Sequence, residues 1–210
     1  MSSLIFHTEP EQVFVAADTL ATLEDGRPLM FTTKSFILPH LKMIICGTGL
    51  GGFLGQWFVE INDRMVVLDI DNLDYHTPKM LRKIWQDEWG KYSNSKLTTT
   101  VYHFGFSLEE GIIHSYAYRS ENNFKSEPLM EFGMRVKPRC NVPENYALPN
   151  DIKKMMEEQR SIQCECLEGD RIHIGGEIII NHLTKDGYNV YTAEKFDDFV
   201  TTEKAIFENF

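Results

Sequence analysis

Short apolar runs separated by turn residues fill the first quarter of the chain, a pattern typical of β-strands. The runs Leu4–Phe6 and Val13–Asp18 flank a polar turn with Pro10, and they predict a hairpin whose second strand ends at Asp18. The runs Lys34–Leu38 and Met43–Gly47 predict a second pair of strands. The intervening segment 23–29, which contains Asp-Gly and Pro, has the composition of a turn.

Three later segments have the features of helices. Apolar residues recur at helical spacing over Phe53–Met65. Thr77-Pro78 combines a cap with proline at a first helical position and predicts that a second helix begins there. A third helix is predicted over about 151–166, with Asn150 as its cap.

Further strands are predicted by apolar alternation around glycine-containing turns. They cover 99–106, 112–119, 132–136, 177–183 and 188–192. The resulting order is strands, two helices, strands, one helix and strands. It predicts an α+β fold in which two sheets pack face to face with helices outside them, and a single domain over residues 1–210.

The charge balance changes what the protein is expected to bind. The 210 residues hold 31 acidic and 21 basic side chains, so the net charge is −10. A negative protein is repelled by phosphate groups, which argues against nucleic acid and anionic membranes as partners. No apolar run approaches the ~20 residues of a membrane-spanning helix.

The chain start and the cysteines indicate a cellular location. The first residues lack the basic start and long apolar stretch of a signal peptide. Four cysteines are too few to form a disulfide framework in a chain of 210 residues. Both features predict a cytoplasmic protein with reduced thiols.

Three residues at equal spacing are candidates for catalysis. Sixteen positions separate Ser2 from Asp18, and sixteen separate Asp18 from Lys34. With Val15-Ala16-Ala17-Asp18, Thr33-Lys34-Ser35-Phe36 and the later Gly175-Gly176, this stretch resembles a proteasome β-type subunit, one of the N-terminal nucleophile (Ntn) hydrolases. The resemblance spans about residues 2–195 and implies a four-layer αββα sandwich, a peptide or amide substrate and a homo-oligomer. It also implies that no metal or cofactor is needed.

The roles that the resemblance implies form a coherent mechanism. A serine hydroxyl needs a base, and the free α-amine of Ser2, exposed by removal of Met1, has an ordinary pKa of about 7.7–8.0 that suits this task. The Lys34 ammonium would favour both the neutral amine and the developing alkoxide, and Asp18 would hold that ammonium. A backbone N–H of Gly47 or Gly49 would bind the oxyanion, with Gly49 preferred.

The sequence departs from the family pattern where the N-terminus should be supported. The segment 131–135 contains no serine, and Ile174 stands where serine should precede Gly175-Gly176. An aspartate expected nearby falls on Arg171, one residue from Asp170. These departures favour an alternative, a catalytically inactive structural or assembly member of the same fold. A third possibility is an unrelated α+β binding domain.

Two other motifs have simpler explanations. The run Gly47–Gly52 lacks the lysine and the spacing of phosphate-binding loops, so a tight turn into a helix explains it better. Cys164 and Cys166 lie two positions apart and so do not face each other on a helix. Because no second cysteine pair is present, we do not expect them to bind a metal with His173.

Overall fold

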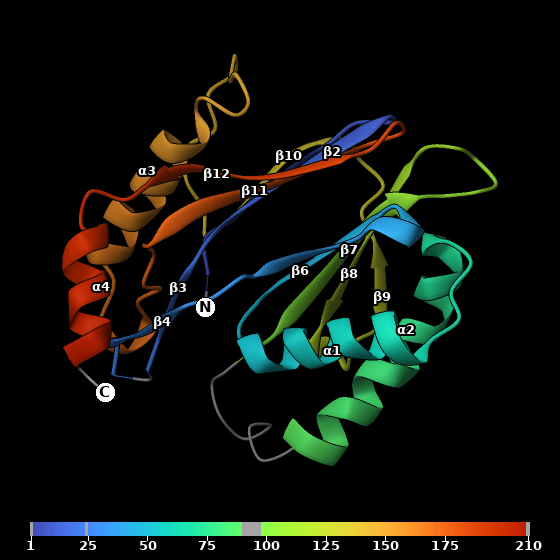
Figure 1. Ribbon diagram of the computed structural model, residues 1–210, viewed down its shortest axis with the longest axis horizontal. Helices are drawn as coiled ribbons and strands as arrows, with labels where there is room; N and C mark the ends of the chain where they lie inside the picture. The colour runs from blue at the N-terminus through green and yellow to red at the C-terminus, as the bar shows by residue number, and fades with distance from the viewer. Residues whose placement is uncertain (1, 24, 90–97, 209–210) are drawn as a thin grey trace.

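Two antiparallel sheets of five strands face each other in the computed structural model, which describes residues 2–23, 25–89 and 98–208 (Figure 1). The first sheet has the spatial order β10 (Gly133–Lys137), β1 (Leu4–Thr8), β2 (Gln12–Asp18), β11 (Glu177–Thr184) and β12 (Tyr188–Lys195). The second has the order β5 (Ser35–Leu38), β6 (Met43–Thr48), β7 (Thr100–Phe106), β8 (Ile113–Arg119) and β9 (Ser126–Pro128). A small hairpin of β3 (Leu20–Thr22) and β4 (Pro28–Phe31) stands apart from both.

Alternating apolar residues of both sheets form the core between them. Leu4, Val13 and Val15 of the first sheet contact Ile44 and Phe104 of the second, and none of these side chains reaches solvent. The alternate residues of each strand point the other way, toward the helices. The sequence pattern therefore places one apolar face of each sheet at the shared core.

Helices cover the remaining apolar faces. On the second sheet lie α1 (Gly51–Arg64) and α2 (Ile70–Ile84), joined to it by a cluster that includes Trp57, Leu81 and Val101. The helix α3 (Ile152–Cys164) packs on the first sheet, and α4 (Phe199–Glu208) lies against β4. Short helical turns occupy Pro39–Leu41, Trp85–Trp89, Ser120–Asn122 and Glu168–Asp170.

The α+β class and the predicted hairpins are confirmed, but two helix predictions are wrong. The second helix begins at Ile70, where the Asp69 side chain accepts a hydrogen bond from the Asn72 N–H, and Pro78 lies inside it. The carboxylate cap and the buried Ile70 and Leu73 outweigh the later Thr-Pro signal. The cap of α3 is Asp151 rather than Asn150.

Within the described residues, no helix is both long and apolar enough to cross a membrane.

Candidate active site

Asp18 joins three separate segments at the end of β2. Its Oδ1 accepts hydrogen bonds from the Ser3 N–H at 2.9 Å and from Lys34 Nζ at 2.7 Å. Its Oδ2 accepts from the Gly175 N–H at 3.1 Å. The carboxylate has no exposed surface, so these donors replace its water. The equal spacing in the sequence thus corresponds to a real contact between Asp18 and Lys34.

Lys34 precedes β5 and is almost completely buried. Besides Asp18, its Nζ donates a hydrogen bond to the Leu20 carbonyl at 2.6 Å. Burial lowers the pKa of the Lys34 amine below its ordinary value, and the charge of Asp18 opposes this shift. The lysine is therefore fixed in position by two acceptors.

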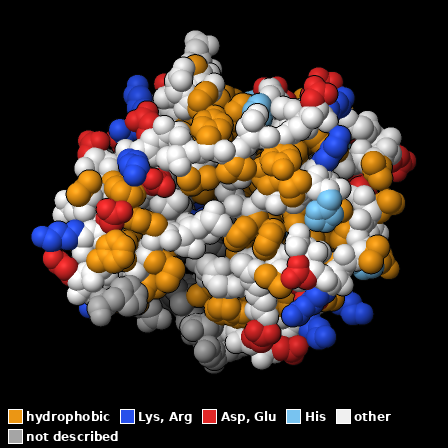
Figure 2. All heavy atoms as spheres, viewed as in Figure 1, with side chains coloured by type: hydrophobic (Ala, Val, Ile, Leu, Met, Phe, Trp, Pro, Cys, Tyr) orange, Lys and Arg blue, Asp and Glu red, His pale blue; other side chains and the backbone are white. Residues whose placement is uncertain are grey.

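A cavity of about 480 Å³ lies beside Lys34. It is lined by Ser2, Lys34 and the turn that follows β6, together with the β3–β4 hairpin and the start of α1. Figure 2 shows that the molecule is hollowed near the middle of this face, with hydrophobic side chains around the hollow. The apolar part of the lining consists of Leu20, Ala21, Leu29, Met30, Leu50 and Leu54.

Ser2 and Ser3 point in different directions although they are neighbours. Ser3 is fully buried, and its hydroxyl donates a hydrogen bond to Oε1 of Gln159 in α3. Gln159 in turn donates from Nε2 to the Pro138 carbonyl. Ser2 lines the cavity instead. The predicted removal of Met1 concerns a residue outside the described ones.

The turn after β6 distinguishes the two glycines. The Gly47 N–H donates to the Lys34 carbonyl at 3.2 Å, so this amide is already engaged. Gly49 has a φ of +103°, and a Cβ at this position would lie 2.1 Å from the Thr98 carbonyl oxygen. Only glycine therefore fits the backbone at position 49, which lines the same cavity as Ser2.

The segments expected to support Ser2 are arranged differently from the family pattern. Gly133 pairs with Thr8, about four residues along β1 from its start, whereas Lys137 pairs with Leu4. Gly133 therefore lies roughly 13 Å along the strand from the start of β1, too far to contact the N-terminus. Ile174 is buried, and the Arg171 guanidinium donates to the Cys164 and Cys166 carbonyls. Sequence reasoning missed Gln159, because its contact with Ser3 joins residues far apart in the chain.

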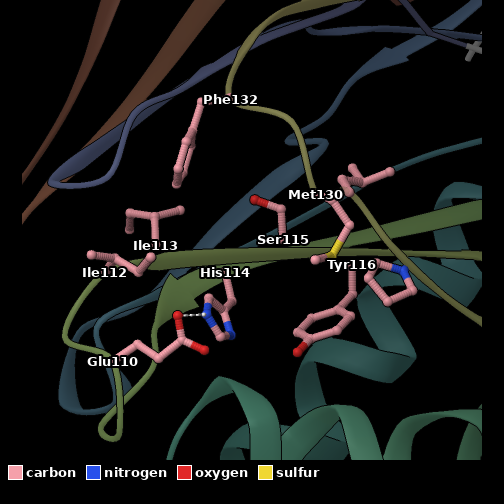
Figure 3. A pocket seen from close by; sticks show the side chains of 10 residues that line it. Glu110, Ile112, Ile113, His114, Ser115, Tyr116, Met130 and Phe132 are labelled. Atoms are coloured by element: carbon pink, nitrogen blue, oxygen red, sulfur yellow. Dashed lines mark ion pairs between the residues drawn. The ribbon is translucent and has the colours of Figure 1, made fainter.

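A second cavity of about 290 Å³ lies beside β8, away from Ser2 (Figure 3). His114 stands at its polar end, with Nδ1 2.7 Å from Asp71 Oδ1 and Nε2 3.5 Å from Glu110 Oε2. The Tyr116 hydroxyl donates to the same Asp71 oxygen at 2.7 Å. Apolar side chains, among them Ile113, Met130 and Phe132, line the rest.

The described residues contain no group of three or more His, Cys, Asp or Glu that could hold a metal ion. Cys164 is exposed and Cys166 is partly buried, and both are free thiols.

Comparison with solved structures places the fold among proteasome-like proteins. The chain is similar to the Anbu complex of Pseudomonas aeruginosa, which forms a helical assembly, with 11% identity, a TM-score of 0.64 and coverage of 99% of this chain and 92% of that one. It is also similar to Anbu (ancestral beta-subunit) from Yersinia bercovieri, with 10% identity, a TM-score of 0.59 and coverage of 99% and 94%. No family model and no curated protein matches the chain.

These similarities correct the resemblance to a proteasome β-type subunit of the Ntn hydrolase family. The structural neighbours are Anbu proteins, which have a proteasome-like fold but form a distinct family. Because strand order is a property of the fold, it could not distinguish one family of this fold from another. At this level of identity the comparison establishes the fold alone.

Proposed function

We propose that this protein hydrolyses an amide bond and uses Ser2 as its nucleophile once Met1 has been removed. One observation carries the proposal: Ser2, Lys34 and Gly49 line one cavity, while the buried Asp18 holds Lys34 from behind. The substrate is a peptide or another amide. The apolar lining favours a substrate with an apolar group next to the bond that is cut.

In the proposed reaction, the Ser2 hydroxyl attacks the carbonyl carbon and its proton passes to the α-amine of the same residue. The Gly49 N–H stabilises the oxyanion, because the Gly47 N–H is already bonded to Lys34. Collapse of this intermediate breaks the C–N bond, and the α-ammonium protonates the departing amine. Water then attacks the remaining ester, which regenerates the Ser2 hydroxyl and releases the acid.

Lys34 acts on the charges in this sequence. Its ammonium lowers the energy of the oxygen anion that forms on Ser2 and disfavours a second positive charge on the α-amine. Asp18 sets its position and is itself too deeply buried to touch a substrate. We therefore assign Asp18 a positioning role, Ser2 a nucleophilic role and Lys34 an electrostatic one.

The two adjacent serines provide the experiment with a matched control. Protein lacking Met1, confirmed by intact mass, is treated with a serine-directed sulfonyl or acyl electrophile, and the modified residue is located by peptide mass spectrometry. We expect an adduct on Ser2 that persists in Ser3→Ala and is lost in Ser2→Ala. No adduct on a chain that demonstrably begins at Ser2 would refute the proposal.

A second candidate function is a structural or assembly role without catalysis. The buried Ile174 and the altered support around the N-terminus favour it, since the Asp18–Lys34 pair would then only tie three segments together. Retention of Met1 in protein purified from its native host would select this alternative.

The layer order, the domain organisation, the cellular location and the oligomeric state stay predictions. The four-layer αββα order and the single domain over 1–210 are supported by the three apolar clusters between sheets and helices. A cytoplasmic location and a homo-oligomer are expected from the sequence, and the helical assembly of the Pseudomonas aeruginosa neighbour supports the second.

A further inference from the structure

The helix α3 carries two buried glutamines on the face that packs against the first sheet. Gln159 has no exposed surface, and Gln163 is 8% exposed. Glutamine is mostly found at protein surfaces, because ordering and desolvating its side chain both cost free energy. The two glutamines are therefore expected to have polar partners inside the protein. The buried residues of the helix, which recur at helical spacing, are Ile152, Met155, Met156, Gln159 and Gln163.

Each glutamine binds a different segment of the chain. Gln159 Oε1 accepts a hydrogen bond from the Ser3 hydroxyl, and Gln159 Nε2 donates to the Pro138 carbonyl. One turn further along α3, Gln163 Oε1 accepts from the Ile172 N–H at 2.9 Å. The first glutamine thus holds the start of the chain, and the second holds the segment that leads to the double glycine.

The position of Ser2 depends on how Ser3 is held. Ser2 lies outside β1 and makes no hydrogen bond with another described residue. The Ser3 N–H donates to Asp18 Oδ1 at 2.9 Å, and the Ser3 carbonyl accepts from the Asp18 N–H at 3.4 Å. These bonds tie Ser3 to β2, and the Gln159 bond ties it to α3. Ser2 is therefore one peptide unit away from an anchor that joins two elements.

We propose that Gln159 is a positioning residue: through Ser3 it fixes the direction of the chain start and keeps Ser2 facing the cavity beside Lys34. The inference rests on the proposed function for its effect on the rate of reaction. A displacement of reacting atoms by about 1 Å can slow a reaction about 100-fold. Gln159 is not among the described residues that line the cavity, so its effect on the rate must pass through Ser3.

A double variant separates positioning from stability. Gln159→Met keeps the approximate size of the side chain but leaves the Ser3 hydroxyl without a partner, so it destabilises the fold. Ser3→Ala leaves Gln159 Oε1 unpaired and has the same kind of cost. The double variant Ser3→Ala/Gln159→Met removes both polar groups, and we expect it to recover part of the lost stability in thermal unfolding. A merely structural contact would restore the reaction together with the stability, whereas a positioning contact would not.

The rate of Ser2 labelling measures the positioning. Chains that begin at Ser2 are treated with a concentration series of phenylmethanesulfonyl fluoride, which separates the maximal labelling rate from the half-saturating concentration. We expect the two single variants and the double variant to label Ser2 about 10–100-fold more slowly at saturation, with the half-saturating concentration unchanged. Gln163→Met, the matched control, removes a buried glutamine one turn away and should keep the wild-type rate. An equal loss in Gln163→Met, or a wild-type rate in the double variant, would overturn the proposal.

The α-amine of Ser2 provides a second readout that needs no reaction. The Lys34 ammonium disfavours another positive charge, so an α-amine placed beside it has a pKa below the ordinary value of about 7.7–8.0. Titration followed by NMR through the Ser2 Cβ shift measures this pKa. We expect a lowered pKa in the wild type and in Gln163→Met, and a pKa closer to the ordinary value in Gln159→Met.

The two readouts distinguish failure of this inference from failure of the proposed function. If the wild type is not labelled but its Ser2 amine shows the expected pattern of pKa values, the proposed function fails and the positioning role of Gln159 stands. If the wild type is labelled but the amine titrates alike in the wild type, Gln159→Met and Gln163→Met, the positioning role is refuted and the proposed function stands.

Discussion

The two cavities each contain a basic side chain held by a carboxylate, but they differ in how far these charges are removed from water. At the Ser2 cavity, Lys34 is 8% exposed and Asp18 is completely buried. At the second cavity, His114 is 23% exposed and Asp71 is 35% exposed. Both pairs have the same 2.7 Å separation. Distance alone therefore does not determine what such a pair contributes.

Burial makes the Lys34–Asp18 pair costly to disrupt, whereas the partly exposed His114–Asp71 pair can be disrupted at a smaller cost in stability. Removing one partner from a buried pair strands the other charge without water, which is strongly destabilising. Near the surface, solvent screens the pair and can replace a missing partner. The Ser2 cavity is thus built on a fixed cation, whereas His114 and Asp71 remain in contact with solvent.

The largest predicted effect comes from Lys34→Met. The variant leaves the Asp18 carboxylate buried with only two amide donors, so we expect a loss of about 3–5 kcal/mol in the free energy of unfolding. Urea denaturation measures it. Arg64→Met, which removes the exposed partner of Glu60, is the surface control, with an expected loss below ~1 kcal/mol. Equal losses in the two variants would erase the contrast between buried and exposed pairs.

An intermediate effect is predicted for Gly49→Ala. The added Cβ would lie 2.1 Å from the Thr98 carbonyl oxygen, on a backbone in the left-handed region. We expect the variant to lose ~1–3 kcal/mol in the free energy of unfolding and to form no Ser2 adduct. Gly55→Ala is the control, because Gly55 lies in α1 with open space around its Cβ and should gain ~0.4–1 kcal/mol. Thermal unfolding compares the two, and a stable Gly49→Ala protein that still forms the adduct would contradict the assigned donor.

The smallest effect is a pH dependence at the second cavity. Burial lowers the pKa of His114, but hydrogen bonds and charge from Asp71 and Glu110 outweigh burial and raise this pKa above its ordinary value. A raised histidine pKa contributes stability that is complete below about pH 6.5 and is lost as the pH rises through the folded-state value.

The variant Asp71→Asn tests this sign. We expect it to reduce the free energy of unfolding by ~0.5 kcal/mol near pH 6, after discounting for solvent screening, and by less near pH 9. Denaturation at both pH values measures the difference. Glu110→Gln, whose partner atom lies farther away, should change less. A loss that grows with pH would show that His114 is not the group responsible.

The sequence predicted the part of the site that depends on strand order. Asp18 ends one strand and Lys34 enters another, and the sheets bring these two ends together over the turn at Gly49. The apolar runs predicted where these strands end, and the resemblance implied the contact, since it assigned Asp18 to hold the Lys34 ammonium. The resemblance led to the wrong family, since the order of strands and helices on which it rested is also that of the Anbu structures.

Contacts that join distant segments could not be predicted. Ser3 meets Gln159, and Asp18 meets the Gly175 amide, across more than 150 positions of the chain. A polar residue such as Gln159 on a predicted helix is ordinarily assigned to the solvent face, and nothing local indicates that it is buried. The place of β12 at the edge of the first sheet likewise depends on topology rather than on local sequence.

The most direct test of the central claim is the pH dependence of Ser2 acylation, measured as the rate of adduct formation in two chains that both begin at Ser2. One chain has a free α-amine and the other is acetylated there. We expect the free chain to reach a rate plateau with a midpoint at or below the ordinary α-amine pKa of about 7.7–8.0, and we expect acetylation to abolish the reaction. An acetylated chain that reacts equally fast would contradict the assignment of the α-amine as the base.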